Sequence, residues 1–178
     1  LVSIHLRPPE IEDRLIPGHW EGDLIMGAGN QSAVGTLVER TTRLVILAKM
    51  DGTTATAASI GFSDKLNEVP RELRLSMTYD QGKEMAHHAE ITQKTGTAIY
   101  FADPHSPWQR GSNENTNGLL RQYLPKGTDL SIYSQEELDA IADSMNTRPR
   151  KTLDWRTPLE VYADVLKKSV AGHKPFNN

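Results

Sequence analysis

The sequence predicts a mixed α/β domain whose central sheet has five strands, the first three of them antiparallel. Three observations lead to this fold class. The order of hydrophobic patterns along the chain is three strands, helix, strand, helix, strand, helix, which is typical of a sheet flanked by helices. The links between the first three strands are short, as in an antiparallel meander. With 178 residues, of which 37% are hydrophobic, the chain is long enough for one well-filled core.

Five segments have the alternation or the boundaries of a strand, namely residues 19–26, 34–39, 44–50, 75–80 and 97–102. In the first of them, alternation separates a hydrophobic side with Trp20 from a side with Glu21 and Asp23. Aspartate is rare in strands. Asp23 is therefore either a charge on an exposed edge strand or a functional carboxylate.

Helices are predicted at residues 53–66, 83–94, 112–124, 134–145 and 157–166. Thr53 and Ser112 are expected to cap the first and third of them. Ser134 and Glu137 form a capping box for the fourth, and Pro158 occupies the first helical position of the last. We expect residues 1–17 to form an extended arm or linker, residues 18–168 a single core domain, and residues 169–178 a tail.

Composition excludes several kinds of site. The chain has no cysteine, which excludes disulfides, thiol catalysis and cysteine-ligated zinc. It has neither a run of about 20 apolar residues nor a signal-peptide pattern, so we expect a soluble intracellular protein without a membrane span. The net charge of -3 does not advertise a nucleic-acid partner, but residues 105–178 carry 10 Lys and Arg against 9 Asp and Glu. This half is the better candidate for facing phosphates.

The stretch 103–127 carries the most functional information. Two prolines and a glycine predict a rigid loop that leads into the third helix and delivers Glu114 to its first turn. At about 100° per residue, Glu114 shares one arc of that helix with Asn117 and Arg121, and the opposite arc is hydrophobic. One face packs against the core and the other faces a polar partner.

Three acids are candidates for one site: Asp23 in the first strand, Asp80 at the end of the fourth, and Glu114. Asp80 alone could equally be a helix cap. If the first and fourth strands are neighbours, the three carboxylates converge, and their repulsion requires hard divalent cations among them. Such a centre suits two-metal cleavage of phosphodiesters. A glycosidase, which needs only two carboxylates, is not excluded by counting acids.

Three stretches of this chain resemble the DDE transposases of bacterial insertion sequences, most closely the insertion-sequence-thirty family. They are His-Trp-Glu-Gly-Asp at 19–23, Tyr-Asp-Gln-Gly-Lys-Glu at 79–84, and 100–123, from Tyr-Phe-Ala-Asp to Gly-Leu-Leu-Arg-Gln-Tyr. Arg-Pro-Arg-Lys at 148–151 and Thr-Pro at 157–158 continue the likeness, and 33 residues lie between the second and third acids, as is usual in that family. The resemblance covers roughly residues 17–165.

The resemblance implies a ribonuclease-H-like integrase core with Asp23, Asp80 and Glu114 as catalytic, metal-binding residues for two Mg²⁺ ions, replaceable by Mn²⁺. It implies cleavage at element ends and transfer of the freed 3′-hydroxyl into target DNA. Gln81 and Met85 depart from the family's usual Asn and Phe. A catalytically silent DNA-binding or assembly module therefore stays open, as does a retroelement-type integrase or ribonuclease H.

DNA is the implied partner, both as terminal repeats of the element and as target, bound by a homodimer or higher oligomer in the bacterial cytoplasm at the nucleoid. We expect contacts with the DNA backbone from polar, basic and aromatic residues of the second half of the chain: Trp108, Arg110, Asn117, Arg121, Arg148, Arg150 and Lys151. The helix-turn-helix region that reads element ends in this family has no counterpart in these residues.

Overall fold

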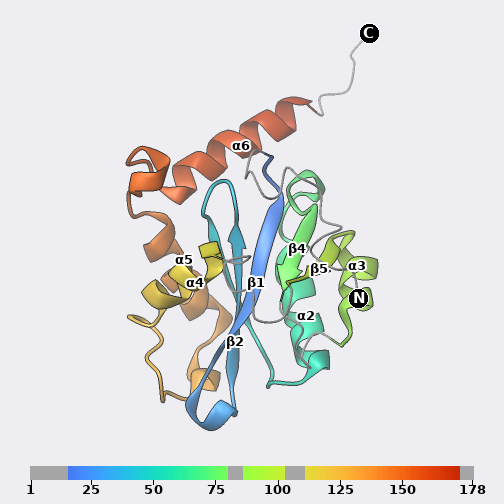
Figure 1. Cartoon of the computed structure of the whole chain (residues 1–178), viewed down its shortest axis with the longest axis vertical. Coiled ribbons are helices and arrows are strands. Elements are labelled where there is room, and N and C mark those ends of the chain that lie inside the picture. The colour runs from blue at the N-terminus through green and yellow to red at the C-terminus, as the bar shows by residue number, and fades with distance from the viewer. Residues whose placement is uncertain (1–15, 80–85, 103–110, 173–178) are drawn as a thin grey trace.

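The predicted fold class is confirmed by the computed structural model, which describes residues 16–79, 86–102 and 111–172, without the side chains of 111–114 and 170–172. A five-stranded sheet in the order β3-β2-β1-β4-β5 runs through the centre, with helices on both faces (Figure 1). The strands are β1 (His19–Met26), β2 (Ala33–Glu39), β3 (Val45–Lys49), β4 (Ser76–Tyr79) and β5 (Ala98–Phe101). The first three are antiparallel, and β4 and β5 run parallel to β1.

The first strand lies in the middle of the sheet. It pairs with β2 along one side, and on the other side His19 pairs with Ser76 and Glu21 with Thr78 of β4. The interpretation of Asp23 as a charge on an edge strand is therefore wrong, because β1 has a neighbour on both sides. The expectation that the first and fourth strands lie side by side is confirmed.

The helices are α2 (Ala55–Leu66), α3 (His88–Thr95), α4 (Gly111–Leu120), α5 (Gln135–Asn146) and α6 (Pro158–Gly172). Single turns of 3-10 helix occur at Ala28–Asn30, Arg71–Leu73, Leu130–Ile132 and Lys151–Leu153. The capping box of α5 and the start of α6 at Pro158 are as predicted. No helix in these ranges is long and apolar enough to cross a membrane.

Four helices have boundaries that differ from the prediction. Thr54, not Thr53, caps α2, and its side chain accepts a hydrogen bond from the backbone of Ala57. The third helix begins at Gly111 and ends at Leu120. Beyond it, the backbone N–H groups of Gln122 and Tyr123 donate to carbonyls three residues earlier, not four. α3 begins at His88 after a turn, and α6 continues to Gly172.

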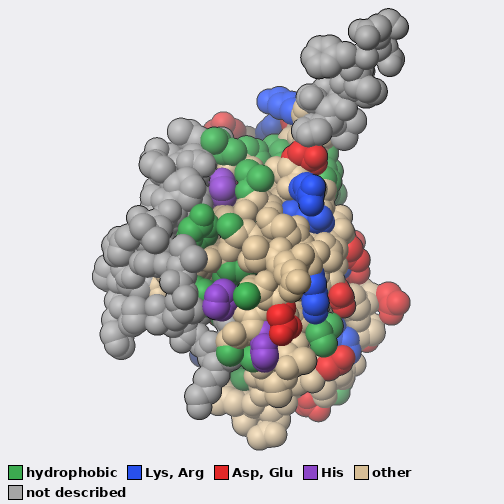
Figure 2. All heavy atoms as spheres, turned by 90° about the vertical axis from the view of Figure 1, so that its right-hand side faces the viewer, with side chains coloured by type: hydrophobic (Ala, Val, Ile, Leu, Met, Phe, Trp, Pro, Cys, Tyr) green, Lys and Arg blue, Asp and Glu red, His purple; other side chains and the backbone are tan. Residues whose placement is uncertain are grey.

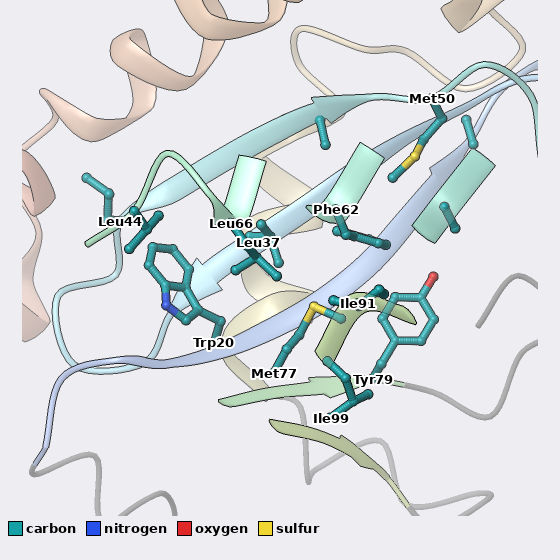
Figure 3. Packing of buried hydrophobic residues seen from close by; sticks show 14 of the residues in the cluster. Trp20, Leu37, Leu44, Met50, Phe62, Leu66, Met77, Tyr79, Ile91 and Ile99 are labelled. Carbon is teal, nitrogen blue, oxygen red and sulfur yellow. The ribbon is translucent and has the colours of Figure 1, made fainter. Parts of the chain in front are cut away.

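Two hydrophobic cores lie on opposite faces of the sheet. On one face α2 and α3 pack on a core that includes Trp20, Leu37, Phe62 and Met77 (Figure 3). Trp20 is completely buried, and its indole N–H donates to the carbonyl of Leu73 at 2.7 Å. On the other face α4 and α5 cover the second core. The alternation predicted for β1 is confirmed, since Trp20 and Asp23 belong to opposite faces.

Two side-chain amides cover the outer edge of β3. Asn146 of α5 accepts from the backbone N–H of Val45 and donates to its carbonyl, both at 2.9 Å. Gln135 accepts from Lys49 N–H at 2.9 Å and donates to the carbonyl of Leu47 at 2.8 Å. These bonds satisfy part of an edge that would otherwise pair with another strand, and they fix α5 on the sheet.

Candidate active site

Asp23 lies in β1 on the face covered by α4 and is partly buried. Its carboxylate is held from two sides. Oδ1 accepts a hydrogen bond from the backbone N–H of Leu24 at 2.8 Å, and Oδ2 accepts one from the side-chain amide of Asn117 at 2.9 Å. Bonds of this kind to a charged oxygen are stronger than those between neutral groups. The carboxylate is therefore oriented before any ligand binds.

Asn117 lies in the last two turns of α4, and its side chain is partly buried. Its amide nitrogen donates to Asp23, whereas its Oδ1 is buried and has no hydrogen-bond partner in the described part of the chain. A buried carbonyl-type oxygen without a partner is costly. Such an oxygen could coordinate a hard cation or accept a hydrogen bond from a water bound to one.

Arg121 locks the end of α4 onto β1. Its guanidinium donates to the carbonyl of Met26 at 3.2 Å and to that of Leu124 at 3.3 Å. Two members of the predicted polar arc, Asn117 and Arg121, therefore face the C-terminal half of β1. Asn117 and Arg121 both have partners within the protein, and their contact with DNA stays a prediction.

The other two predicted metal ligands are less completely described. Asp80 lies outside the described residues, and the strand before it ends at Tyr79, next to β1. Glu114 lies in α4 three residues before Asn117, but its side chain is not described. Accordingly the described residues contain no group of three His, Cys, Asp or Glu that could hold a metal ion. The triad stays a prediction, and Asp23 is the member whose side chain the structure describes.

The remaining predicted DNA contacts fall into two sets. Trp108 and Arg110 lie outside the described residues. Arg148 stacks over the ring of Tyr123, 5.5 Å from its centroid, and donates to its hydroxyl. Arg150 is partly buried and Lys151 is exposed. Burial, and secondly the charge of Arg148, lowers the pKa of Arg150.

A buried ion pair, which sequence reasoning did not find, lies close to Asp23 along β1. Glu21 lies two residues before Asp23 on the same side of β1, is fully buried, and pairs with Arg40 at 2.9 Å. Breaking such a pair leaves a buried charge without compensation. The pattern Glu-x-Asp in a strand was a signal that both acids share a face, but only the structure identifies Arg40 as the partner.

Comparison with known proteins decides the family. Residues 15–107 match the family model described as integrase core domain. The chain belongs to the integrase core domain family. The matched range holds all five strands, including the one that carries Asp23.

Relatives of this integrase core are transposases of insertion sequences, so the expected resemblance is confirmed. This chain is 69% identical over 166 residues to the transposase for insertion sequence element IS1086 of Cupriavidus metallidurans. It is 50% identical over 158 residues to transposase InsI for IS30A of Escherichia coli. These matches cover 93% and 89% of the chain, but only 49% and 41% of the two relatives. The chain therefore spans less than half the length of both.

Solved structures with this fold include retroviral integrases. The catalytic core domain of the BIV integrase superposes with a TM-score of 0.62 at 16% identity, covering 86% of this chain and 98% of that one. A chain of the simian T-cell lymphotropic virus intasome, in complex with a PP2A regulatory subunit, gives 0.65 at 17% identity, with 92% and 57% covered. The integrase core therefore has the expected ribonuclease-H-like fold.

Proposed function

We propose that this chain is the catalytic domain of a DDE transposase, which cleaves DNA at the ends of an element and joins them to target DNA. The observation that carries the proposal is the register between β1 and β4. His19 lies opposite Ser76 and Glu21 opposite Thr78, and two further residues in the same register would bring position 80 beside Asp23. The parallel register of β1 and β4 thus supports a shared site for Asp23 and Asp80.

The position of helix α4 supports Glu114 as the third member of the proposed site. Asn117 contacts Asp23 directly, and Glu114 lies three residues earlier, so both positions occupy one side of the helix. A carboxylate on that arc could reach the space beside Asp23. With the unpartnered Oδ1 of Asn117, the donor set would consist of oxygens, which suits Mg²⁺ or Mn²⁺.

The proposed chemistry has two steps. A water oxygen attacks a phosphodiester at the element end, and the bond to the 3′ oxygen breaks, which leaves a 3′-hydroxyl. That hydroxyl then attacks a phosphodiester of the target, which releases one target strand end. Divalent ions, when bound, would activate the attacking oxygen and stabilise the leaving one. The protein's own part is to hold Asp23, Asp80 and Glu114 around the reacting phosphate and to orient Asp23 through Asn117.

The partners follow from this chemistry. Joining two element ends requires two reacting sites on one DNA complex, so we propose that at least two copies of the chain act together. The substrates would be the terminal repeats and the target duplex, in the bacterial cytoplasm where the nucleoid lies. The relatives are longer than this chain, so recognition of the repeats would also use residues outside it.

The test is nicking of a supercoiled plasmid by the chain in the presence of Mg²⁺ or Mn²⁺. Wild type is expected to nick only with the metal, and Asp23→Asn and Asp80→Asn to lose this activity while keeping the unfolding transition. Asp64→Asn, in an exposed position of α2 on the other face of the sheet, is the matched control and should retain it.

Two results would contradict the proposal. Full nicking by Asp80→Asn would remove Asp80 from the site. DNA binding by wild type without any metal-dependent nicking would favour the silent binding module instead. Contaminating nuclease is identified by its equal activity in all four preparations.

A further inference from the structure

A pocket of about 220 Å³ lies on another side of α4 from Asp23. Its walls come from three separate parts of the chain: the β2–β3 turn, the middle of α4 and the loop between α5 and α6. The described residues that line it are polar or positively charged: Arg43, Asn115, Thr116, Arg150, Lys151 and Thr152. Three of them are cations and none is an acid, in a chain whose net charge is -3.

The loop that supplies two of the cations is held by its own backbone. Arg150 N–H donates to the carbonyl of Arg156 at 2.9 Å, and the carbonyl of Arg150 accepts from Trp155 at 2.8 Å. Asp154 and Trp155 both have left-handed backbones, with φ of 54° and 67°. Non-glycine residues adopt this region rarely. The surrounding bonds therefore fix an unusual loop, and this fixes the positions of Arg150 and Lys151.

The β2–β3 turn fixes the third cation in the same way. Arg43 also has a left-handed backbone, with φ of 65°, and its N–H donates to the carbonyl of Glu39 at 2.9 Å. The backbone positions of all three cations are thus fixed by bonds within the protein before any ligand binds. Preorganisation of this kind lowers the entropic cost of binding.

Arg150 carries the electrostatic cost of the arrangement. Its Nε is buried and has no hydrogen-bond partner in the described part of the chain. Both burial and the charge of Arg148 disfavour its charged form and lower its pKa. An anion in the pocket would favour the charged form of Arg150 against both effects and could accept hydrogen bonds from its N–H groups.

The pocket and Asp23 lie on different sides of one helix. Asn115 lines the pocket and Asn117 contacts Asp23, and two residues of helix correspond to a rotation of about 200°. A helix with its side chains is about 10 Å across, and one DNA strand carries a phosphate about every 3.4 Å along the helix axis. A strand that crosses α4 would therefore place a phosphate at the pocket a few nucleotides from one at Asp23.

We propose that the pocket formed by Arg43, Arg150, Lys151, Asn115 and Thr116 binds a backbone phosphodiester of the DNA strand that crosses α4, on the side away from Asp23. The inference rests on the proposed function, since it takes DNA as the ligand. The role of the pocket is to set the position of the DNA strand on α4. Contacts to phosphate oxygens position a strand but carry no sequence information.

The test is the salt dependence of binding to a labelled 30-base-pair duplex, measured by fluorescence anisotropy without divalent metal. Each phosphate contact contributes about 0.9 to the slope of log affinity against log salt. Lys151→Gln, at an exposed position, is expected to lower the slope by about that amount. Between 50 and 200 mM salt, wild type would then lose about 3.5-fold more affinity than the variant.

The controls match each change in charge. Lys94→Gln removes an exposed cation from α3, on a side of the molecule where Lys, Arg, Asp and Glu are interspersed (Figure 2), and should leave the slope unchanged. Asn115→Asp adds an acid to the pocket and should weaken binding several-fold. Gln122→Glu adds one at an exposed position beyond the end of α4 and should not.

Equal slopes for Lys151→Gln and Lys94→Gln, with Asn115→Asp binding as tightly as Gln122→Glu, would overturn the inference. Inorganic phosphate provides a second arm: if it raises the Tm of wild type but not of Lys151→Gln, while DNA binding is equal in both, the pocket takes a free anion and not DNA. Metal-dependent nicking by wild type is read separately, so the proposed function can survive either result.

Discussion

Replacement of Asn117 by alanine tests whether the protein orients Asp23. The change removes the 2.9 Å hydrogen bond to Oδ2 of Asp23 and leaves the bond from Leu24 N–H in place. A hydrogen bond to a charged group contributes about 1.5 to 3 kcal/mol, which corresponds to roughly 10-fold to 100-fold in an equilibrium constant. The loss of a partner that orients a metal ligand has effects of the same size. We therefore expect Mn²⁺ affinity to fall by that factor.

The assay is calorimetric titration of the chain with Mn²⁺ in the absence of DNA. Asn115→Ala is the matched control, because it removes the same side chain from an exposed position of α4 that does not contact Asp23. It should bind Mn²⁺ as wild type does. Equal or tighter binding by Asn117→Ala would refute the reasoning, since Asn117 would then compete with the metal or have no part in the site.

Three further predictions concern stability, measured by urea unfolding. Gly35→Ala should destabilise the fold by about 1 to 3 kcal/mol, because the new Cβ would lie 3.1 Å from the buried ring of Phe62. Gly118→Ala places its Cβ in open space and should stabilise the fold by about 0.5 to 1 kcal/mol. Effects of the same sign in the two variants would contradict this reasoning. Arg40→Met should cost about 3 to 5 kcal/mol by leaving Glu21 charged and buried, and the double variant with Glu21→Gln should recover part of that loss. Burial raises the pKa of Glu39 above its ordinary 4.5. The stability that protonated Glu39 contributes should therefore be lost as the pH rises from 4.5 through the raised pKa. If the free energy of unfolding of wild type changes with pH over this range as that of Glu39→Gln does, the prediction is wrong.

Alternation was sufficient to divide the residues of β1 between the two faces of the sheet. Trp20 and Asp23 are on the expected sides, because a strand with a core on each face still obeys the period of two. The neighbours of β1 were a different matter. Parallel pairing with β4 depends on a crossover through β2, β3 and α2, which local patterns do not encode.

The contacts of the site also exceed what spacing can predict. The helical arc placed Asn117 with Arg121 correctly, but a polar arc does not say whether it faces DNA or another part of the protein. In the structure it faces β1, through the bonds of Asn117 to Asp23 and of Arg121 to Met26. The cationic pocket was equally hidden, because Arg43 and Lys151 are more than 100 positions apart in the sequence and meet only through the fold.

The most direct test of the central claim is a crystal structure of the chain grown with Mn²⁺, in which the anomalous signal locates the ions. The account predicts a peak bonded to carboxylate oxygens of Asp23, Asp80 and Glu114 at about 2.0 to 2.3 Å, with Asn117 still donating to Asp23. An ordered structure in which Asp80 and Glu114 lie beyond coordination distance of an ion at Asp23 would contradict it.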